Sequence, residues 1–255
     1  MLKILICILA GLGAGLGTGF AGMSAAAVIS PMLIAFLDMD PYMAVGIALA
    51  SDVLASAVSA VTYGRSKNLD VRNGLVMMAA VLCFTAVGSF VASIVPKTTM
   101  GNFSVVMTLL LGIKFIVKPV VAPKPCLTDA TTTQKIIRSL LGGALVGFIC
   151  GFVGAGGGMM MLLVLTSLLG YELKTAVGTS VFIMSVTALT GAVSHFAIGG
   201  LPDITALIVC VVSTLVFAQV AALFANRAQP QSLNRVTGAV LVVLGTAILI
   251  VNFCK

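Results

Sequence analysis

Long runs of apolar residues, separated by short polar stretches, make up nearly the whole chain. In the first half the pattern predicts helical segments at residues 2–22, 24–37, 42–63, 71–95 and 101–121. In the second half it predicts them at residues 137–154, 157–170, 174–197, 203–226 and 233–253. Apolar runs of about 18 residues or more are typical of membrane-spanning helices. Barrel strands would alternate apolar and polar residues, so we predict an all-α membrane protein.

Two of these segments, 24–37 and 157–170, are too short to span a bilayer. A helix of 14 residues reaches about 21 Å, against a hydrocarbon thickness of about 30 Å. Each follows a glycine-rich break, at Gly22-Met23-Ser24 and at Gly154-Ala155-Gly156-Gly157-Gly158. We therefore expect short broken or hairpin helices whose breaks meet near the membrane midplane. Non-helical backbone at that depth must be buried in protein or line a wet cavity.

The chain also repeats itself at an offset of 132 residues. Gly11, Gly15, Gly19, Phe20 and Gly22 recur as Gly143, Gly147, Gly151, Phe152 and Gly154. Two apolar copies of one unit are typical of membrane transporters, in which the substrate site lies between the copies. The sequence thus predicts a first transmembrane repeat at 1–121, a cytoplasmic linker at 122–136 and a second repeat at 137–255.

The distribution of basic residues predicts the orientation of the repeats. With an odd number of crossings per half, 11 of the 14 lysines and arginines fall on one side, and only Lys3, Lys97 and Lys255 on the other. An even number of crossings divides them 10 to 4. Basic residues favour the cytoplasmic side, so the odd arrangement is preferred. It makes the two repeats inverted copies, with both termini outside a cell inner (plasma) membrane.

Composition excludes several classes of protein. Of the 255 residues, 60% are hydrophobic and 8% charged, whereas soluble domains carry about 25% charged residues. The net charge of +7 lies in short loops rather than in a patch for nucleic acid. Six scattered cysteines form no CxxC pair, so no metal site or cofactor is expected. With one histidine, His195, and no nucleotide-binding P-loop, neither an enzyme nor direct ATP drive is indicated.

The two breaks are the strongest candidates for a binding site. A helix that begins after a break points its free N–H groups and positive dipole end at that break, which suits an anion. Ser24 can cap this helix or line the site, and Gly156, Gly157 and Gly158 leave the backbone bare. Thr179 and Ser180, after Gly178, could add hydroxyl groups or bond back to their own helix. Packing of helices is the alternative role of the glycines.

Asp52 is the only acidic residue deep within a long segment. A carboxylate at bilayer depth is costly and normally faces a cavity or a partner. It could couple transport to a proton or a cation, or it could be a neutral carboxyl bonded to a neighbouring helix. Its counterpart at the repeat offset is Met184, so the two halves are not equivalent here.

The glycine-rich run from Gly147 to Gly158, with the AVGTS run from Ala176 to Ser180, resembles the TauE/SafE family of sulfite exporters and sulfonate permeases. The first half departs from this pattern at residues 23–26 and 46–48. The resemblance implies a secondary transporter of sulfur oxyanions or organosulfonates that works by alternating access. Its partners would be the lipid bilayer and a small anion, with a homo-oligomer left open. A carrier of another small solute or reduced sulfur compound, or a membrane assembly partner, is the alternative.

Overall fold

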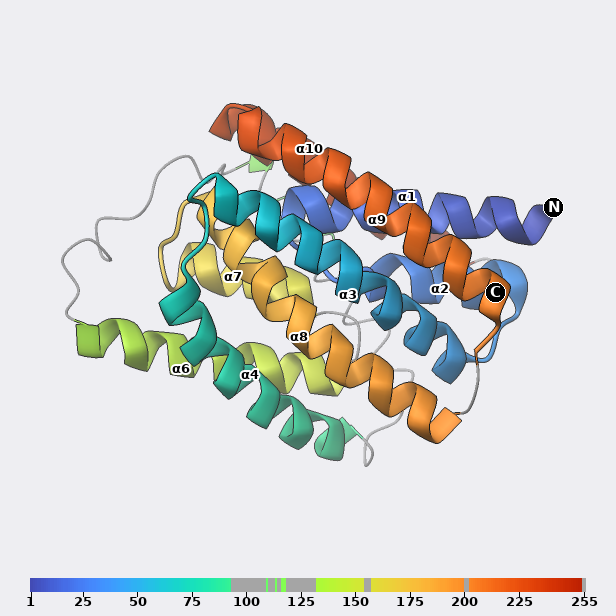
Figure 1. Ribbon diagram of the computed structural model, residues 1–255, viewed down its shortest axis with the longest axis horizontal. Coiled ribbons are helices and arrows are strands. Elements are labelled where there is room, and N and C mark those ends of the chain that lie inside the picture. The colour runs from blue at the N-terminus through green and yellow to red at the C-terminus, as the bar shows by residue number, and fades with distance from the viewer. Residues whose placement is uncertain are drawn as a thin grey trace.

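The computed structural model describes residues 1–92, 132–153, 157–199 and 202–253, with isolated positions between residues 109 and 117. Every regular element in these ranges is an α-helix (Figure 1). The helices are α1 (Leu2–Ala21), α2 (Ala26–Leu37), α3 (Pro41–Arg65), α4 (Val71–Ala92), α6 (Thr132–Val153), α7 (Gly157–Ser167), α8 (Leu173–Gly199), α9 (Ile204–Arg227) and α10 (Pro230–Phe253). Most of the expected segment 101–121 and most of the linker 122–136 lie outside the described residues.

Four helices in the described ranges are long and apolar enough to cross a membrane: Leu2–Ala21, Met43–Arg65, Leu173–Ala197 and Ile204–Arg227. On α9, Ile208, Val212, Val216 and Val220 recur at helical spacing, and each is more than half exposed. Such a continuous apolar face cannot remain in water. The chain is therefore a membrane protein, as its apolar runs predict.

Polar residues set the beginnings of several helices. Asp40 precedes α3 and accepts a hydrogen bond from the Met43 N–H at 3.1 Å, while Pro41 takes the first helical position. Asp203 does the same for α9, accepting from the Ala206 N–H at 3.0 Å. Helix α6 begins at Thr132, five residues before the expected start at 137. Residues 132–136 contain no glycine or proline that would stop a helix there.

Contacts between helix ends show which of the helices α1, α3, α8 and α9 run in the same direction. Lys3 of α1 pairs with Asp203 at the start of α9, and the Asn68 side chain, after α3, donates to Asn226 of α9 at 2.8 Å. Helices α1, α3 and α9 therefore run the same way. Helix α8 runs opposite to α3, because the start of α8 lies against the end of α3. The start of α1 lies at the same end of the molecule as the start of α9 (Figure 1).

The two spaced glycine rows lie in helix–helix contacts. Along α1, Gly11, Gly15 and Gly19 pack against Ser213, Phe217 and Ala221 of α9. Along α6, Gly143 and Gly147 pack against the backbone of α4, where a Cβ on Gly147 would meet the Val81 carbonyl oxygen at 2.4 Å. Helices α1 and α9 run parallel to each other, and so do α4 and α6. The first pair runs opposite to the second (Figure 1). These glycines allow close backbone approach, which is the packing role left open by their spacing.

Candidate functional site

The first break, residues 22–25, turns the chain back on itself between α1 and α2. Gly22 has a φ of +59°, a conformation that side chains rarely adopt. Its N–H donates to the Thr18 carbonyl at 2.9 Å, and the Met23 N–H donates to Gly17 at 3.4 Å, which together cap α1. The Thr18 hydroxyl then donates to the Met23 carbonyl at 3.0 Å. The break is thus a tight turn that is held in place by these hydrogen bonds.

A carboxyl group from α3 faces the start of α2. Ser24 accepts a hydrogen bond from the Ala26 N–H at 3.3 Å, and its side chain lies next to Asp52 together with the Ala25 N–H. Asp52 is completely buried, near the middle of α3. Its Oδ1 accepts from the Ser56 hydroxyl at 2.7 Å, but Oδ2 makes no hydrogen bond within the described part of the chain.

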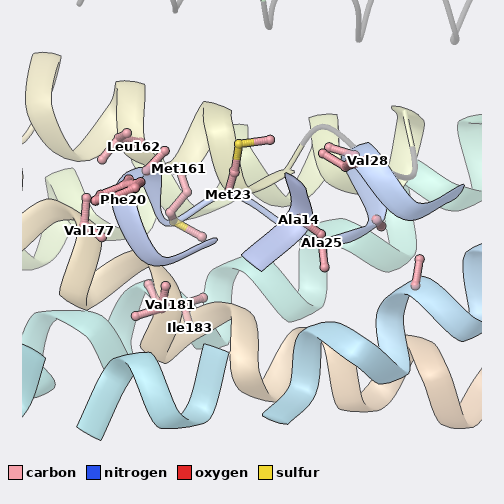
Figure 2. Close-up of a cluster of buried hydrophobic side chains, with 14 of the residues drawn as sticks. Ala14, Phe20, Met23, Ala25, Val28, Met161, Leu162, Val177, Val181 and Ile183 are labelled. Carbon is pink, nitrogen blue, oxygen red and sulfur yellow. The ribbon is translucent and has the colours of Figure 1, made fainter. Parts of the chain in front are cut away.

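Residues from the second half of the chain also contact this first break. The Ser180 hydroxyl, on α8, donates to the Gly22 carbonyl at 2.7 Å. Gly158, in the first turn of α7, lies so close that a Cβ there would be 2.4 Å from the Ser24 nitrogen. The starts of α2 and α7 therefore meet. Figure 2 shows Met23 and Ala25 of the break in one buried cluster with Met161 and Leu162 of α7.

The structure thus brings together Ser24, Asp52, Gly158 and Ser180. Thr179 does not point toward this group. Its hydroxyl accepts a hydrogen bond from the Asp70 N–H at 3.2 Å, at the connection between α3 and α4. Gly156 lies outside the described residues. Gly157 is the first residue of α7, and its surroundings also lie outside what the structure describes.

A polar cluster joins the two halves at the end that contains the α3–α4 connection. The Tyr171 hydroxyl donates to Oδ2 of Asp70 at 2.7 Å, and Lys174 donates to the Asn226 carbonyl at 2.9 Å. Burial, and then the hydrogen bond to Asp70, raises the pKa of Tyr171, which keeps it neutral. Exposed basic residues surround this end: Arg65, Lys67, Arg72 and Arg227.

Three further residues support the break, and sequence reasoning missed them. Thr18 and Ser56 make the bonds described above, and the buried Tyr63 hydroxyl donates to the Gly19 carbonyl at 2.8 Å. Ser56 was detectable, because a serine four residues after an aspartate lies on the same face of a helix. Thr18 and Tyr63 carry no comparable signal.

Among the described residues, no three His, Cys, Asp or Glu side chains gather where they could hold a metal ion. His195, on α8, has its Nδ1 2.9 Å from the Gly191 carbonyl. Cys7 and Cys210 are buried and Cys83 is exposed, all as free thiols. The chemistry available at the break is therefore that of backbone N–H groups, hydroxyl groups and one carboxyl.

Comparison with known proteins identifies the family. A family model described as "Sulfite exporter TauE/SafE" matches residues 7–248. The chain belongs to the TauE/SafE family. Its relatives include two proteins of Bacillus subtilis. "Probable membrane transporter protein YunE" is 27% identical over 78% of this chain and 80% of its own length. "Probable membrane transporter protein YdhB" is 24% identical over 89% of this chain and 90% of its own length. A Haemophilus influenzae protein, again described as a probable membrane transporter, is 26% identical over 77% and 75%.

Membership of TauE/SafE confirms the resemblance carried by the glycine-rich and AVGTS runs. The match covers both halves of the chain, including the first half, where the motifs are altered. The family consists of membrane transporters, which agrees with the apolar helices found here. Each relative is described by transport alone, without a substrate.

Proposed function

We propose that this TauE/SafE protein is a secondary transporter that carries a small anion, a sulfur oxyanion or an organosulfonate, by alternating access. The observation that carries the proposal is the meeting of two helix starts, α2 and α7, at a buried break beside the middle of α3. The family description, sulfite exporter, supports the same class of substrate.

Helix starts bind anions without arginine or lysine. The first N–H groups of a helix have no partner within it, and the macrodipole adds about half a positive charge at that end. Sulfite, sulfate and sulfonate groups present several oxygen atoms that can each accept an N–H. Ser24 and Ser180 add hydroxyl groups at the break, and Gly158, without a side chain, lets the start of α7 lie directly against the Ser24 backbone. We propose that Gly156 and Gly157 line the path near this site, whereas Thr179 lies at the α3–α4 connection.

Alternating access is supported by the directions of the helices. Helix α8, the counterpart of α3 at the repeat offset, runs opposite to α3, and the pair α1–α9 runs opposite to the pair α4–α6. These directions support the proposal of inverted repeats, an arrangement that can exchange conformations across the membrane. The basic end of the molecule would face the cytoplasm, with both termini outside an inner membrane.

Labelling of single cysteines from each side of the membrane tests this orientation. In a cysteine-free background, Thr205→Cys at the start of α9 is expected to react with an impermeant maleimide added to intact cells. Ser66→Cys, at the basic end, is expected to react only after the cells are opened. Both residues are exposed, so accessibility differs only by side. Labelling of Ser66→Cys in intact cells would reverse the orientation.

A flux panel in proteoliposomes tests the substrate class. We expect saturable exchange of at least one of sulfite, sulfate, thiosulfate and methanesulfonate, about tenfold faster than chloride. A tenfold preference corresponds to about 1.4 kcal/mol, roughly one additional hydrogen bond to the anion. Empty liposomes give the background. Flux that is equal for chloride would exclude a site built for oxyanions, and no flux of any anion would favour the assembly role.

A further inference from the structure

We infer that Asp52 binds the proton that accompanies the anion, so that the transporter is a proton–anion symporter with a single internal proton site. The inference rests on the proposed function and assigns its coupling ion. In the absence of substrate, the carboxylate of Asp52 is the negative group at the break. When the anion enters, Asp52 takes up a proton and becomes neutral.

The position of Asp52 is that of an anion at a helix start. Its carboxyl lies next to the Ala25 N–H and the Ser24 side chain, where α2 begins. Oδ1 accepts from Ser56, whereas Oδ2 is fully buried without a hydrogen bond in the described part of the chain. A buried carboxyl oxygen without a hydrogen-bond donor is suited to bind a proton, because burial without donors disfavours the charged form of the acid.

The charges at the break make the substrate and the Asp52 carboxylate competitors. The starts of α2 and α7 together supply roughly one positive charge. One carboxylate balances them, but a carboxylate and a substrate anion together leave an uncompensated negative charge at membrane depth. For a monovalent anion such as methanesulfonate, adding one proton to Asp52 removes that excess. Anion binding and proton binding therefore favour each other, and by linkage each increases the affinity for the other to the same extent.

Among the described residues, the neighbours of the Asp52 carboxyl carry no charge that would replace the proton. They are the Ser24 and Ser56 hydroxyls and the Ala25 N–H. Helices α1, α2, α8 and α9 pack against α3. Helix α2 contains no ionisable side chain. Those described on the other three helices have partners of their own or lie near helix ends: Lys3, Cys7, Lys174, His195, Cys210 and Arg227.

The asymmetry of the repeats restricts coupling to one proton per chain. At the repeat offset the counterpart of Asp52 is Met184 on α8, which is buried and cannot titrate. The start of α7 therefore has no carboxylate at the corresponding position. We infer that the substrate anion supplies the negative charge there.

Purified full-length protein in liposomes that contain the pH dye pyranine tests the inference. The probes are methanesulfonate and thiosulfate, whose charges stay constant over the neutral pH range, with the membrane potential clamped. An inward anion gradient should acidify the lumen of wild-type liposomes, and an inward gradient of one pH unit should accumulate methanesulfonate about tenfold. Asp52→Asn should still exchange the anion across the membrane but should show no acidification and no accumulation.

Glu172→Gln is the matched control, since it removes a carboxylate on the α7–α8 connection, where Glu172 accepts from Thr175. It should acidify like the wild type. If no anion in the panel exchanges, the proposed function fails. If exchange proceeds but wild-type uptake does not acidify the lumen, if a sodium gradient drives it instead, or if Asp52→Asn still acidifies, the inference on Asp52 is overturned while the proposed function stands.

Discussion

Replacing Gly158 by valine is expected to lower anion flux about 100-fold and to destabilise the fold by about 1–3 kcal/mol. Even the first atom of the new side chain would lie 2.4 Å from the Ser24 nitrogen and 2.7 Å from the Met23 Cα. These are backbone atoms of the break and cannot rotate away. The break or the start of α7 must shift, which moves the N–H groups proposed to bind the anion. Flux is measured in proteoliposomes with a saturating transported anion.

The loss of flux should exceed what the loss of folding explains. Because the chain has no tryptophan, thermal unfolding is best followed by the helical circular dichroism signal. Gly64→Ala provides the control, since a Cβ at Gly64 meets a Leu69 methyl at 3.4 Å, an ordinary contact. That variant should transport normally and be equally or more stable, because alanine favours helix. If Gly158→Val keeps wild-type flux and stability, the prediction is wrong and Gly158 is a packing residue that tolerates a larger side chain.

The helices could be predicted from the sequence because apolar runs and breakers are local signals. The expected segments 2–22 and 203–226 became α1 at Leu2–Ala21 and α9 at Ile204–Arg227. The short segment 157–170 became α7 at Gly157–Ser167, as its length and its glycines predict. The early start of α6 was missed, because a largely polar run such as residues 132–136 is compatible with either a linker or a helix that extends beyond the lipid.

The site was only partly predictable, because it depends on how helices pack. Ser24 and Asp52 are each recognisable, as a cap after a break and as a buried acid. Their proximity follows from the packing of α2 on α3, which no local pattern encodes. Thr179 and Ser180 show the same limit. Adjacent residues of a helix point about 100° apart, so one hydroxyl reaches the break while the other reaches the α3–α4 connection.

Replacing Gly178 by alanine is expected to cost at least about 2 kcal/mol of stability and most of the transport activity, although it adds a single methyl group. A Cβ at Gly178 would lie 1.9 Å from the Asn68 carbonyl oxygen and 2.8 Å from the Tyr63 Cβ. Because the first of these is backbone, relief requires moving the α3–α4 connection. That movement breaks the bond between Thr179 and Asp70 and strains the adjacent bond from Ser180 to Gly22. Thermal unfolding and anion exchange are measured on the same preparation.

Gly191→Ala, on the same helix, separates this effect from the general cost of a larger residue in α8. The atoms nearest to a Cβ at Gly191 would belong to the side chain of Leu49, whose nearest methyl is 2.9 Å away and can rotate. We expect that variant to retain wild-type exchange and nearly wild-type stability. If Gly178→Ala behaves like Gly191→Ala, the α3–α4 connection yields easily and does not hold Ser180 against the break. If instead only Gly178→Ala fails, the glycine of the AVGTS run is required because the Asn68 backbone rests directly on it.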